Sequence, residues 1–463
     1  MKKSVMLMSL PLICPNVGMA DPVQGAQNDA QPNVIIILAD DLGYGDLGLT
    51  GSEQIKTPNI DQLAQNGVFC SQAYVSSAVS SPSRAGLLTG KNQVTFGYDN
   101  NLSNCQPGYD IEYLGLPTKE KTIADRLKAR GYVTGIVGKW HLGEAEKFHF
   151  KNRGFMEYWG YLGGGHNYLK SAPNGKGYNA PILTNTGAST QITYLTDDKG
   201  DQCVNFINRH KSEPFFLYAS FNAPHAPLEA KESDLKKYAH IADKKRRTYC
   251  AMVSCLDDNV GKIVAALKKN KQLDNTIIFF LSDNGGPVGT RTCNVPYRGQ
   301  KGTLLEGGIH VPYIVSYPKA LPKGKVYDGT VSSLDIAATA CALAHADAKE
   351  LHGVNLLPYL DGTTAGQPHD NLMWRFTISA AIREGNYKLV RLPDRLPMLF
   401  DLSKDIREEH DLTLEKPEVA KRLVKKLGNW DVTLPHVLFV EGPGWRKIQL
   451  KNYDKEYMKE QPK

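Results

Sequence analysis

Residues 33–41 read Asn-Val-Ile-Ile-Ile-Leu-Ala-Asp-Asp, a run of apolar, mostly β-branched residues that ends in two adjacent carboxylates. An apolar run without polar alternation is typical of a strand that is buried on both faces. Segments of similar character lie at 132–137, 214–221, 276–281 and 311–317, with helical segments between them. Strands that alternate with helices predict an α/β fold, in which helices cover both faces of a mostly parallel sheet.

The character of the chain changes near residue 347. Residues 380–391 alternate between apolar and polar side chains and predict a strand; a shorter strand is expected at 399–402 and an amphipathic helix at 417–427. We therefore expect an α/β catalytic domain over residues 21–346 and a smaller α+β subdomain over residues 347–463.

The first twenty residues have the pattern of a secretory signal peptide. Lys2 and Lys3 precede an apolar run over residues 5–17, and Gly18-Met19-Ala20 resembles a cleavage site. Residues 1–20 are thus predicted to be removed, and the mature protein to be periplasmic or secreted. A lipoprotein acylated at Cys14 is the weaker alternative, because Pro-Leu-Ile is a poor approach to such a cysteine.

Composition excludes several classes of protein. The chain has 463 residues, of which 41% are hydrophobic and 22% charged, as in ordinary globular proteins. No later stretch is apolar enough to span a bilayer. Without Lys2 and Lys3 the formal charge falls from +7 to +5. That excess suits an anionic substrate, although solubility explains it as well. The basic run 244–247 is too short for a nucleic-acid stripe, so no nucleic-acid partner is expected.

Two acidic pairs follow predicted strands. Asp40-Asp41 comes after the first strand, and Asp283-Asn284 after the strand at 276–281. Ligands of such sheets bind at the carboxyl ends of the strands. An isolated Asp-Asp is usually a turn or a helix cap, but two pairs at matching strand ends favour a cation site. Carboxylate and amide oxygens suit Ca²⁺, or less well Mg²⁺.

Basic and titratable side chains occupy comparable positions. Lys139 and His141 follow the second strand, His225 follows the strand at 214–221, and Arg298 and Lys301 lie in a glycine-rich loop. Each of them alone would most simply be structural or exposed. Together they suit the binding of a tetrahedral oxyanion.

The segment Ser80-Ser81-Pro82-Ser83-Arg84 resembles the modification signature of the type I sulfatases. Five more segments resemble motifs of that family in the family's order: 38–46 (LADDLGYGD), 138–143 (GKWHLG), 224–227 (PHAP), 282–286 (SDNGG) and 298–302 (RGQKG). The tail segments 382–389 and 399–402 resemble its C-terminal subdomain. The likeness covers nearly the whole mature chain.

The resemblance implies an alkaline-phosphatase-like fold and a nucleophile made after translation. Ser80 would be oxidised to formylglycine by a formylglycine-generating enzyme, here an anaerobic sulfatase-maturating enzyme because the signature begins with Ser rather than Cys. Hydrated formylglycine has two hydroxyls: one attacks sulfur and the other expels the sulfate. The implied Ca²⁺ ligands are Asp40, Asp41, Asp283, Asn284 and the modified residue 80.

The same resemblance implies a role for each basic residue. Arg84 and Lys139 would hold the nucleophile, and Lys301 would hold the sulfate oxygens. His225 would protonate the leaving alcohol, while His141 would take a proton when sulfate is expelled.

The expected substrate is a sulfated poly- or oligosaccharide, with galactans such as carrageenan favoured over mucins or glycosaminoglycans. His166 and Asn167, in a glycine-rich segment similar to one in carbohydrate sulfatases, could bind sugar hydroxyls; Arg291 and Asn294 are further candidates. A glycine-rich turn between packed aromatic residues explains the first pair equally well.

Two other functions stay open from the sequence. A phosphatase or phosphodiesterase of the same superfamily would use an unmodified Ser or Thr and two zinc ions, but no histidine-rich ligand set is apparent. A catalytically silent sulfated-glycan-binding protein would result if Ser80 were never oxidised. The sequence does not decide whether Ser80 is natural or replaces a cysteine.

Overall fold

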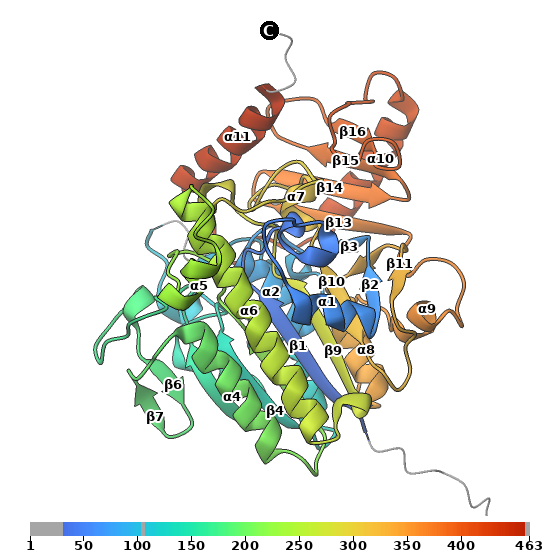
Figure 1. Cartoon of the computed structure of the whole chain (residues 1–463). Helices are drawn as coiled ribbons and strands as arrows, with labels where there is room; N and C mark the ends of the chain where they lie inside the picture. The colour runs from blue at the N-terminus through green and yellow to red at the C-terminus, as the bar shows by residue number, and fades with distance from the viewer. Residues whose placement is uncertain (1–30, 103–106, 459–463) are drawn as a thin grey trace, which may run out of the picture. The chain divides into compact units, whose positions relative to one another are not determined.

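Strand β1 (Asn33–Ala39) runs through the middle of a ten-stranded sheet. Its neighbours β8 (Phe215–Ser220) and β9 (Thr276–Ser282) are both parallel to it (Figure 1). The computed structural model describes residues 31–102 and 107–458. The predicted signal peptide and Cys14 therefore lie outside the described residues.

The strand order is β11-β2-β10-β9-β1-β8-β4-β5-β6-β7, and the five strands from β9 to β5 are mutually parallel. The prediction of an α/β fold with a sandwiched, mostly parallel sheet is confirmed. Strand β10 pairs antiparallel with β9, and at the far edge β6 pairs antiparallel with both β5 and β7. The remaining strands of this sheet are β2 (Val68–Cys70), β4 (Val133–Lys139), β5 (Glu157–Tyr161), β6 (Ile182–Thr184), β7 (Gly187–Ser189), β10 (Tyr313–Ser316) and β11 (Lys325–Tyr327).

Both faces of the sheet are covered, which explains the continuous apolar run of β1. Ile35 and Ile37 share one core with Met252, whereas Val34 and Ile36 share the other with Leu88. The first face carries α1 (Pro58–Gln65), α4 (Leu195–Arg209), α5 (Glu232–Lys237) and α6 (Lys244–Lys269), of which α4 and α6 lie across the sheet in Figure 1. The second carries α2 (Ser80–Thr89), α3 (Ile123–Lys128) and α8 (Asp335–Leu343).

A four-stranded antiparallel sheet follows: β13 (Asn371–Phe376), β14 (Ser379–Glu384), β15 (Tyr387–Arg391) and β16 (Met398–Asp401). The single strand expected at 380–391 was wrong. The chain reverses at Gly385, whose φ of 56° is accessible to glycine, so β14 and β15 form a hairpin. Helix α10 (Pro417–Asp431) packs on one face of this sheet through Leu423 and Leu427.

The other face of the small sheet joins the main core, because Trp374 and Phe376 belong to the same apolar cluster as Ile36. The predicted boundary between residues 346 and 347 stays a prediction. A final helix, α11 (Pro443–Met458), was not anticipated from the sequence. Within the described residues no helix is long and apolar enough to cross a membrane. Shorter elements are β3 (Ala73–Tyr74), β12 (Val331–Ser332), α7 (Glu306–Ile309) and α9 (Leu357–Asp361).

Candidate active site

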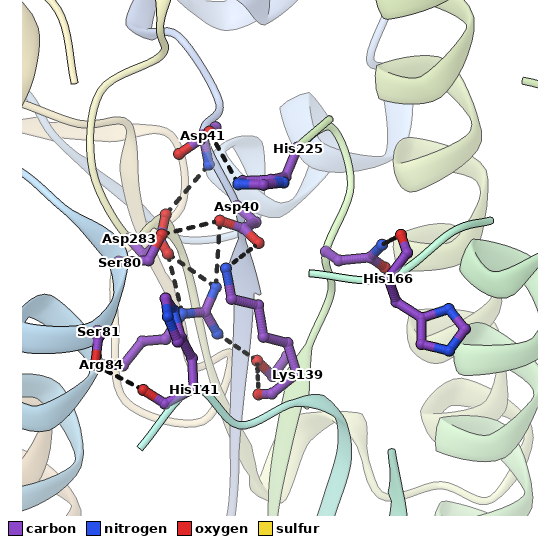
Figure 2. A network of polar contacts seen from close by, with 12 residues as sticks. Asp40, Asp41, Ser80, Ser81, Arg84, Lys139, His141, His166, His225 and Asp283 are labelled. Carbon is purple, nitrogen blue, oxygen red and sulfur yellow. Dashed lines mark hydrogen bonds and ion pairs between the residues drawn. The ribbon is translucent and has the colours of Figure 1, made fainter. Parts of the chain in front are cut away.

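Four neighbouring strands of the large sheet deliver polar side chains to one edge. In the order β9, β1, β8 and β4, their carboxyl ends lead into Asp283-Asn284, Asp40-Asp41, the turn with His225, and Lys139 with His141 (Figure 2). The parallel direction of these strands is what brings residues far apart in sequence to one place.

Ser80 is the first residue of α2, a helix on the second face of the sheet, and it lies at the same edge as these side chains. Its Oγ lies 3.2 Å from Oδ1 of Asp40 and 3.3 Å from Oδ1 of Asn284. The neighbouring Ser81 holds the turn, because its Oγ donates to the carbonyl of His141 at 2.7 Å. Asn101 also supports it by accepting from the backbone N–H of Ser81 at 2.9 Å.

Arg84 lies one helical turn after Ser80 and is fully buried. Its Nε donates to Oδ2 of Asp283 at 3.0 Å, and its Nη2 lies 2.9 Å from the same oxygen and 3.7 Å from Asp40. Its Nη1 donates to Oγ of Ser220 at 2.6 Å. The guanidinium therefore joins two of the carboxylates in a fixed geometry.

Two lysines neutralise the Asp40-Asp41 pair. Nζ of Lys139 lies 2.6 Å from Asp40, and Nζ of Lys301 lies 2.7 Å from Asp41. Burial acts to raise the pKa of Asp40, but Lys139, His225 and Arg84 outweigh it and hold that pKa at about 2. Burial likewise acts to raise the pKa of Asp41, but Lys301 outweighs it, so that this pKa is also lowered. Both carboxylates are thus ionised at neutral pH.

The oxygen atoms around Ser80 fit a hard divalent cation. Asn284 donates from Nδ2 to Asp41 at 2.7 Å, and its Oδ1 faces the hydroxyl of Ser80 at 3.3 Å. Ligand atoms of Asp40, Asp41 and His225 lie within 4.8 Å of one another, the one such cluster of His, Cys, Asp and Glu residues within 31–102 and 107–458. With carboxylate and amide oxygens predominating, the set suits Ca²⁺ or Mg²⁺ better than zinc.

The two histidines present different nitrogen atoms to the site. Nδ1 of His225 contacts the carbonyl of Ala226 at 2.6 Å, and its Nε2 faces Asp41 at 3.7 Å. Both ring nitrogens of His141 are buried without a hydrogen-bond partner among the described residues. Burial, with Lys139 and Arg84 nearby, holds the pKa of His141 well below its usual value. His141 is therefore a neutral ring in the cavity lining whose two nitrogen atoms have no hydrogen-bond partner within the described residues.

These side chains form the floor of a cavity of about 540 Å³. Ser80, Asp41, His141, His225 and Lys301 line it. Arg84 and Lys139 lie behind them with no solvent exposure. The structure thus brings together every residue predicted to be catalytic or metal-binding.

The four residues predicted to contact sugar lie elsewhere. Both ring nitrogens of His166 contact backbone carbonyls, at 2.6 and 2.7 Å, and Figure 2 shows this residue apart from the others. Asn167 donates to Asn179, Arg291 pairs with Asp243, and Asn294 bonds the backbone of Gly286. None of the four lines the cavity. Their role in substrate binding stays a prediction that the geometry does not support.

The glycine-rich segment contributes in another way. A Cβ on Gly164 would lie 2.6 Å from Nε2 of His141, and one on Gly165 would lie 2.5 Å from the ring of Tyr178. The glycines therefore allow the backbone to pack directly on two rings that line or border the cavity.

Sequence reasoning missed the residues of the opposite wall. Helix α11 contributes four cavity residues, Trp445, Ile448, Gln449 and Asn452, and Phe376 and Glu441 lie beside them. The spacing of the four on a helix was the available signal, but no helix was expected there. Ser220, the last residue of β8, was also missed, although it lies within the strand predicted at 214–221.

The sulfatase family model matches residues 32–346, more than half of the chain. The chain belongs to the sulfatase family. A second model, the C-terminal region of N-sulphoglucosamine sulphohydrolase, matches residues 300–432 of this sulfatase.

Characterised relatives and solved structures agree with this assignment. The sulfatase is 34% identical to N-acetylgalactosamine-6-sulfatase of Homo sapiens, over 86% of this chain and 85% of the human protein. The crystal structure of Ps i-CgsB in complex with k-i-k-neocarrahexaose matches with a TM-score of 0.84 and 36% identity, over 93% of this chain and 100% of that one. A protein from glycosaminoglycan metabolism in Bacteroides thetaiotaomicron matches with a TM-score of 0.73 and 27% identity, over 87% and 99%.

Membership of this family makes the protein a sulfuric ester hydrolase. The single histidine in the carboxylate cluster disfavours the phosphatase alternative, because a two-zinc site needs a richer set of nitrogen ligands.

Proposed function

We propose that this sulfatase hydrolyses sulfate esters of a sulfated carbohydrate, using formylglycine at position 80 and a bound Ca²⁺. The observation that carries the proposal is the placement of Ser80 on the floor of the cavity, with its Oγ between the oxygens of Asp40 and Asn284. The carrageenan oligosaccharide bound to the structural relative, and the amino-sugar sulfate named for the human relative, support a sulfated galactan or a related sugar.

The two groups that complete the site supply its reactivity. Hydrated formylglycine provides one hydroxyl that attacks sulfur and a second hydroxyl that then expels the sulfate from the enzyme. Calcium held by Asp40, Asp41, Asp283, Asn284 and residue 80 would withdraw electron density from the sulfate and favour the ionised nucleophile.

The protein's own cations hold negative charge where the reaction develops it. Lys139 and Arg84 lie behind the nucleophile and pair with Asp40 and Asp283. By neutralising these carboxylates, the two cations make an ionised hydroxyl at position 80 more favourable. Lys301 reaches into the cavity itself and can contact the sulfate oxygens. Asp283, hydrogen-bonded to Arg84, helps to activate the attacking hydroxyl.

The histidines move the protons. We assign to His225, which offers Nε2 to the cavity, the proton that goes to the leaving sugar oxygen. His141 accepts a proton when sulfate leaves, a role that suits a neutral ring with unpaired nitrogens. Both roles need the side chains to face the substrate, as their positions in the cavity wall allow.

The maturation and location of the enzyme belong to the same proposal. An anaerobic sulfatase-maturating enzyme would oxidise Ser80, and export to the periplasm or medium is supported by the pattern of residues 1–20. A silent glycan-binding protein is the less favoured alternative, because binding alone has little use for Arg84 and Lys139, which lie buried behind Ser80 rather than in the cavity lining.

The test begins with the chemical state of residue 80. The protein is produced with and without an anaerobic maturating enzyme, and the peptide that ends at Arg84 is analysed by mass spectrometry. We expect maturation to remove the mass of two hydrogen atoms and to bring activity on sulfated galactose oligosaccharides. Treatment with EGTA should abolish that activity, and Ca²⁺ should restore it better than Mg²⁺ does. Full activity with an unmodified Ser80 peptide, or after exhaustive chelation, would refute the mechanism.

A further inference from the structure

We propose that the first turns of α11, together with Glu441, form a subsite for a sugar ring that carries the scissile sulfate and no second anionic group. This inference rests on the proposed function and concerns the wall of the same cavity. It predicts which sulfated sugars the enzyme accepts.

One face of α11 is directed at the cavity. Trp445, Ile448, Gln449 and Asn452 follow the spacing i, i+3, i+4 and i+7, which places them on one side of a helix. Trp445 and Ile448 are each 44% exposed and both line the cavity, so together they give this wall an open apolar surface. An indole at the edge of a cavity presents a flat apolar surface that fits the apolar face of a pyranose ring.

The rest of the helix is fastened to the protein. Nε2 of Gln449 donates to both carboxylate oxygens of Glu441 at 2.8 Å, and its Oε1 accepts from the hydroxyl of Thr377. The hydroxyl of Tyr453 accepts from the backbone N–H of Leu304 at 2.7 Å. These contacts hold α11 in place, and neither Trp445 nor Ile448 takes part in them.

The charges of the cavity are divided between its floor and its walls. Among the described lining residues, Lys301 is the only Lys or Arg, and its position beside Asp41 on the floor suits the scissile sulfate. The walls carry two acids, Glu144 near the glycine-rich segment and Glu441 beside α11. A second sulfate or a carboxylate on the same ring would meet these acids without a cation to pair with, and like charges brought together in a cavity repel. Sugar hydroxyls, in contrast, can donate to carboxylates.

The experiment compares matched sugars. Kinetic constants are measured for matured wild-type enzyme on galactose 4-sulfate and galactose 6-sulfate, and on the same sugars with an additional 2-sulfate. We expect the better monosulfate to exceed its disulfate in kcat/KM by about tenfold or more. Trp445→Ala should raise KM for the monosulfate about tenfold with little change in kcat, as expected for lost binding of the ring. Trp445→Phe should retain most of the affinity.

Two further variants separate charge from fold. Glu441→Gln should lower the ratio of kcat/KM for the monosulfate to kcat/KM for the disulfate about tenfold, since it removes the repelling charge and keeps the shape of the side chain. Lys447→Ala, an exposed position on α11 outside the cavity, is the control and should change neither constant. Thermal unfolding of each variant confirms that it is folded.

Equal rates on mono- and disulfates, or an unchanged KM in Trp445→Ala, would overturn the inference. Failure of the proposed function looks different, because matured wild-type enzyme would then hydrolyse none of the sugars. In that event calorimetric titration with the same four sugars still tests the subsite, and equal affinity for mono- and disulfates would refute it.

Discussion

Nζ of Lys139 lies 2.6 Å from Oδ2 of Asp40, and neither side chain has any exposure to solvent. Lys139 is the last residue of β4 and Asp40 directly follows β1, and β8 lies between these two strands in the sheet. Each charge has lost its hydration and depends on the other; Arg84 also supports Asp40, but it repels the Lys139 ammonium. The active site is thus also a point where the folded state is electrostatically vulnerable.

Removing both members of this pair should destabilise the protein by less than the sum of the two single losses. Asp40→Asn leaves the Lys139 ammonium buried without its closest partner, and we expect the free energy of unfolding to fall by about 3–5 kcal/mol. The double variant Asp40→Asn/Lys139→Met should lose less than the sum of the single losses. Urea unfolding in EGTA measures the free energy of unfolding of Asp40→Asn, Lys139→Met and the double variant. Strict additivity would contradict the coupling.

Replacing His225 should separate substrates by their leaving groups. His225→Ala is expected to lower kcat on a sugar sulfate by roughly 10²–10⁴, because the leaving alkoxide then lacks a proton donor. The loss on 4-nitrophenyl sulfate should be much smaller, since nitrophenolate leaves without protonation. Steady-state kinetics on both substrates check this, with His240→Ala, an exposed position, as the control. An equal loss on both would assign another role to His225.

A single methyl group on Gly164 should disturb catalysis through His141. Its Cβ would lie 2.6 Å from Nε2 of that ring, whereas a Cβ on the adjacent Gly163 would meet only Glu144, at 3.6 Å. We expect Gly164→Ala to lower kcat at least about tenfold, and Gly163→Ala to behave like wild type. Melting temperatures of both variants distinguish a displaced ring from a misfolded loop. Equal activity of the two variants would show that the ring position is not critical.

The selectivity of the cavity should depend on pH through Glu441. Burial raises the pKa of this carboxyl to about 7, only partly offset by Gln449, Thr377 and Arg446. Below pH 7 the group is neutral, so the preference for a monosulfated over a disulfated sugar should weaken as the pH falls through 7. Since both substrates use the same catalytic groups, the ratio of their kcat/KM values isolates this effect. In Glu441→Gln the ratio should not change with pH.

The same raised pKa has a consequence for stability. The folded protein keeps a proton on Glu441 that the unfolded chain releases near its ordinary pKa of 4.5. The stabilisation linked to that proton is complete below pH 4.5 and is lost as the pH rises through about 7. Urea unfolding of wild type and Glu441→Gln should therefore differ in its pH dependence between these values. Parallel curves would indicate that Glu441 titrates normally.

Much of the fold was predictable because its signals are local. The apolar run 33–38 specifies a buried strand that forms as expected, as β1. The hairpin of β14 and β15 was missed, since Gly385-Asn386 interrupts the alternation too briefly to be read as a turn. Of the site, the charged residues could be predicted from their positions after strands and from the family motifs. Whether His166 and Asn294 contact the sugar stays a prediction, because both side chains hydrogen-bond to the backbone and neither lines the cavity.

The sequence by itself determined the sulfatase family, the parallel sheet and the charged floor of the cavity. These features follow from apolar periodicity and from motifs whose residues sit next to strand ends. Only the tertiary structure decided what faces the substrate. Trp445 and Ser80 are 365 positions apart in the chain and line one cavity, and that proximity arises from the packing of α11, which no local pattern encodes. The free nitrogens of His141 and the acidic walls are likewise properties of the assembled core rather than of any segment.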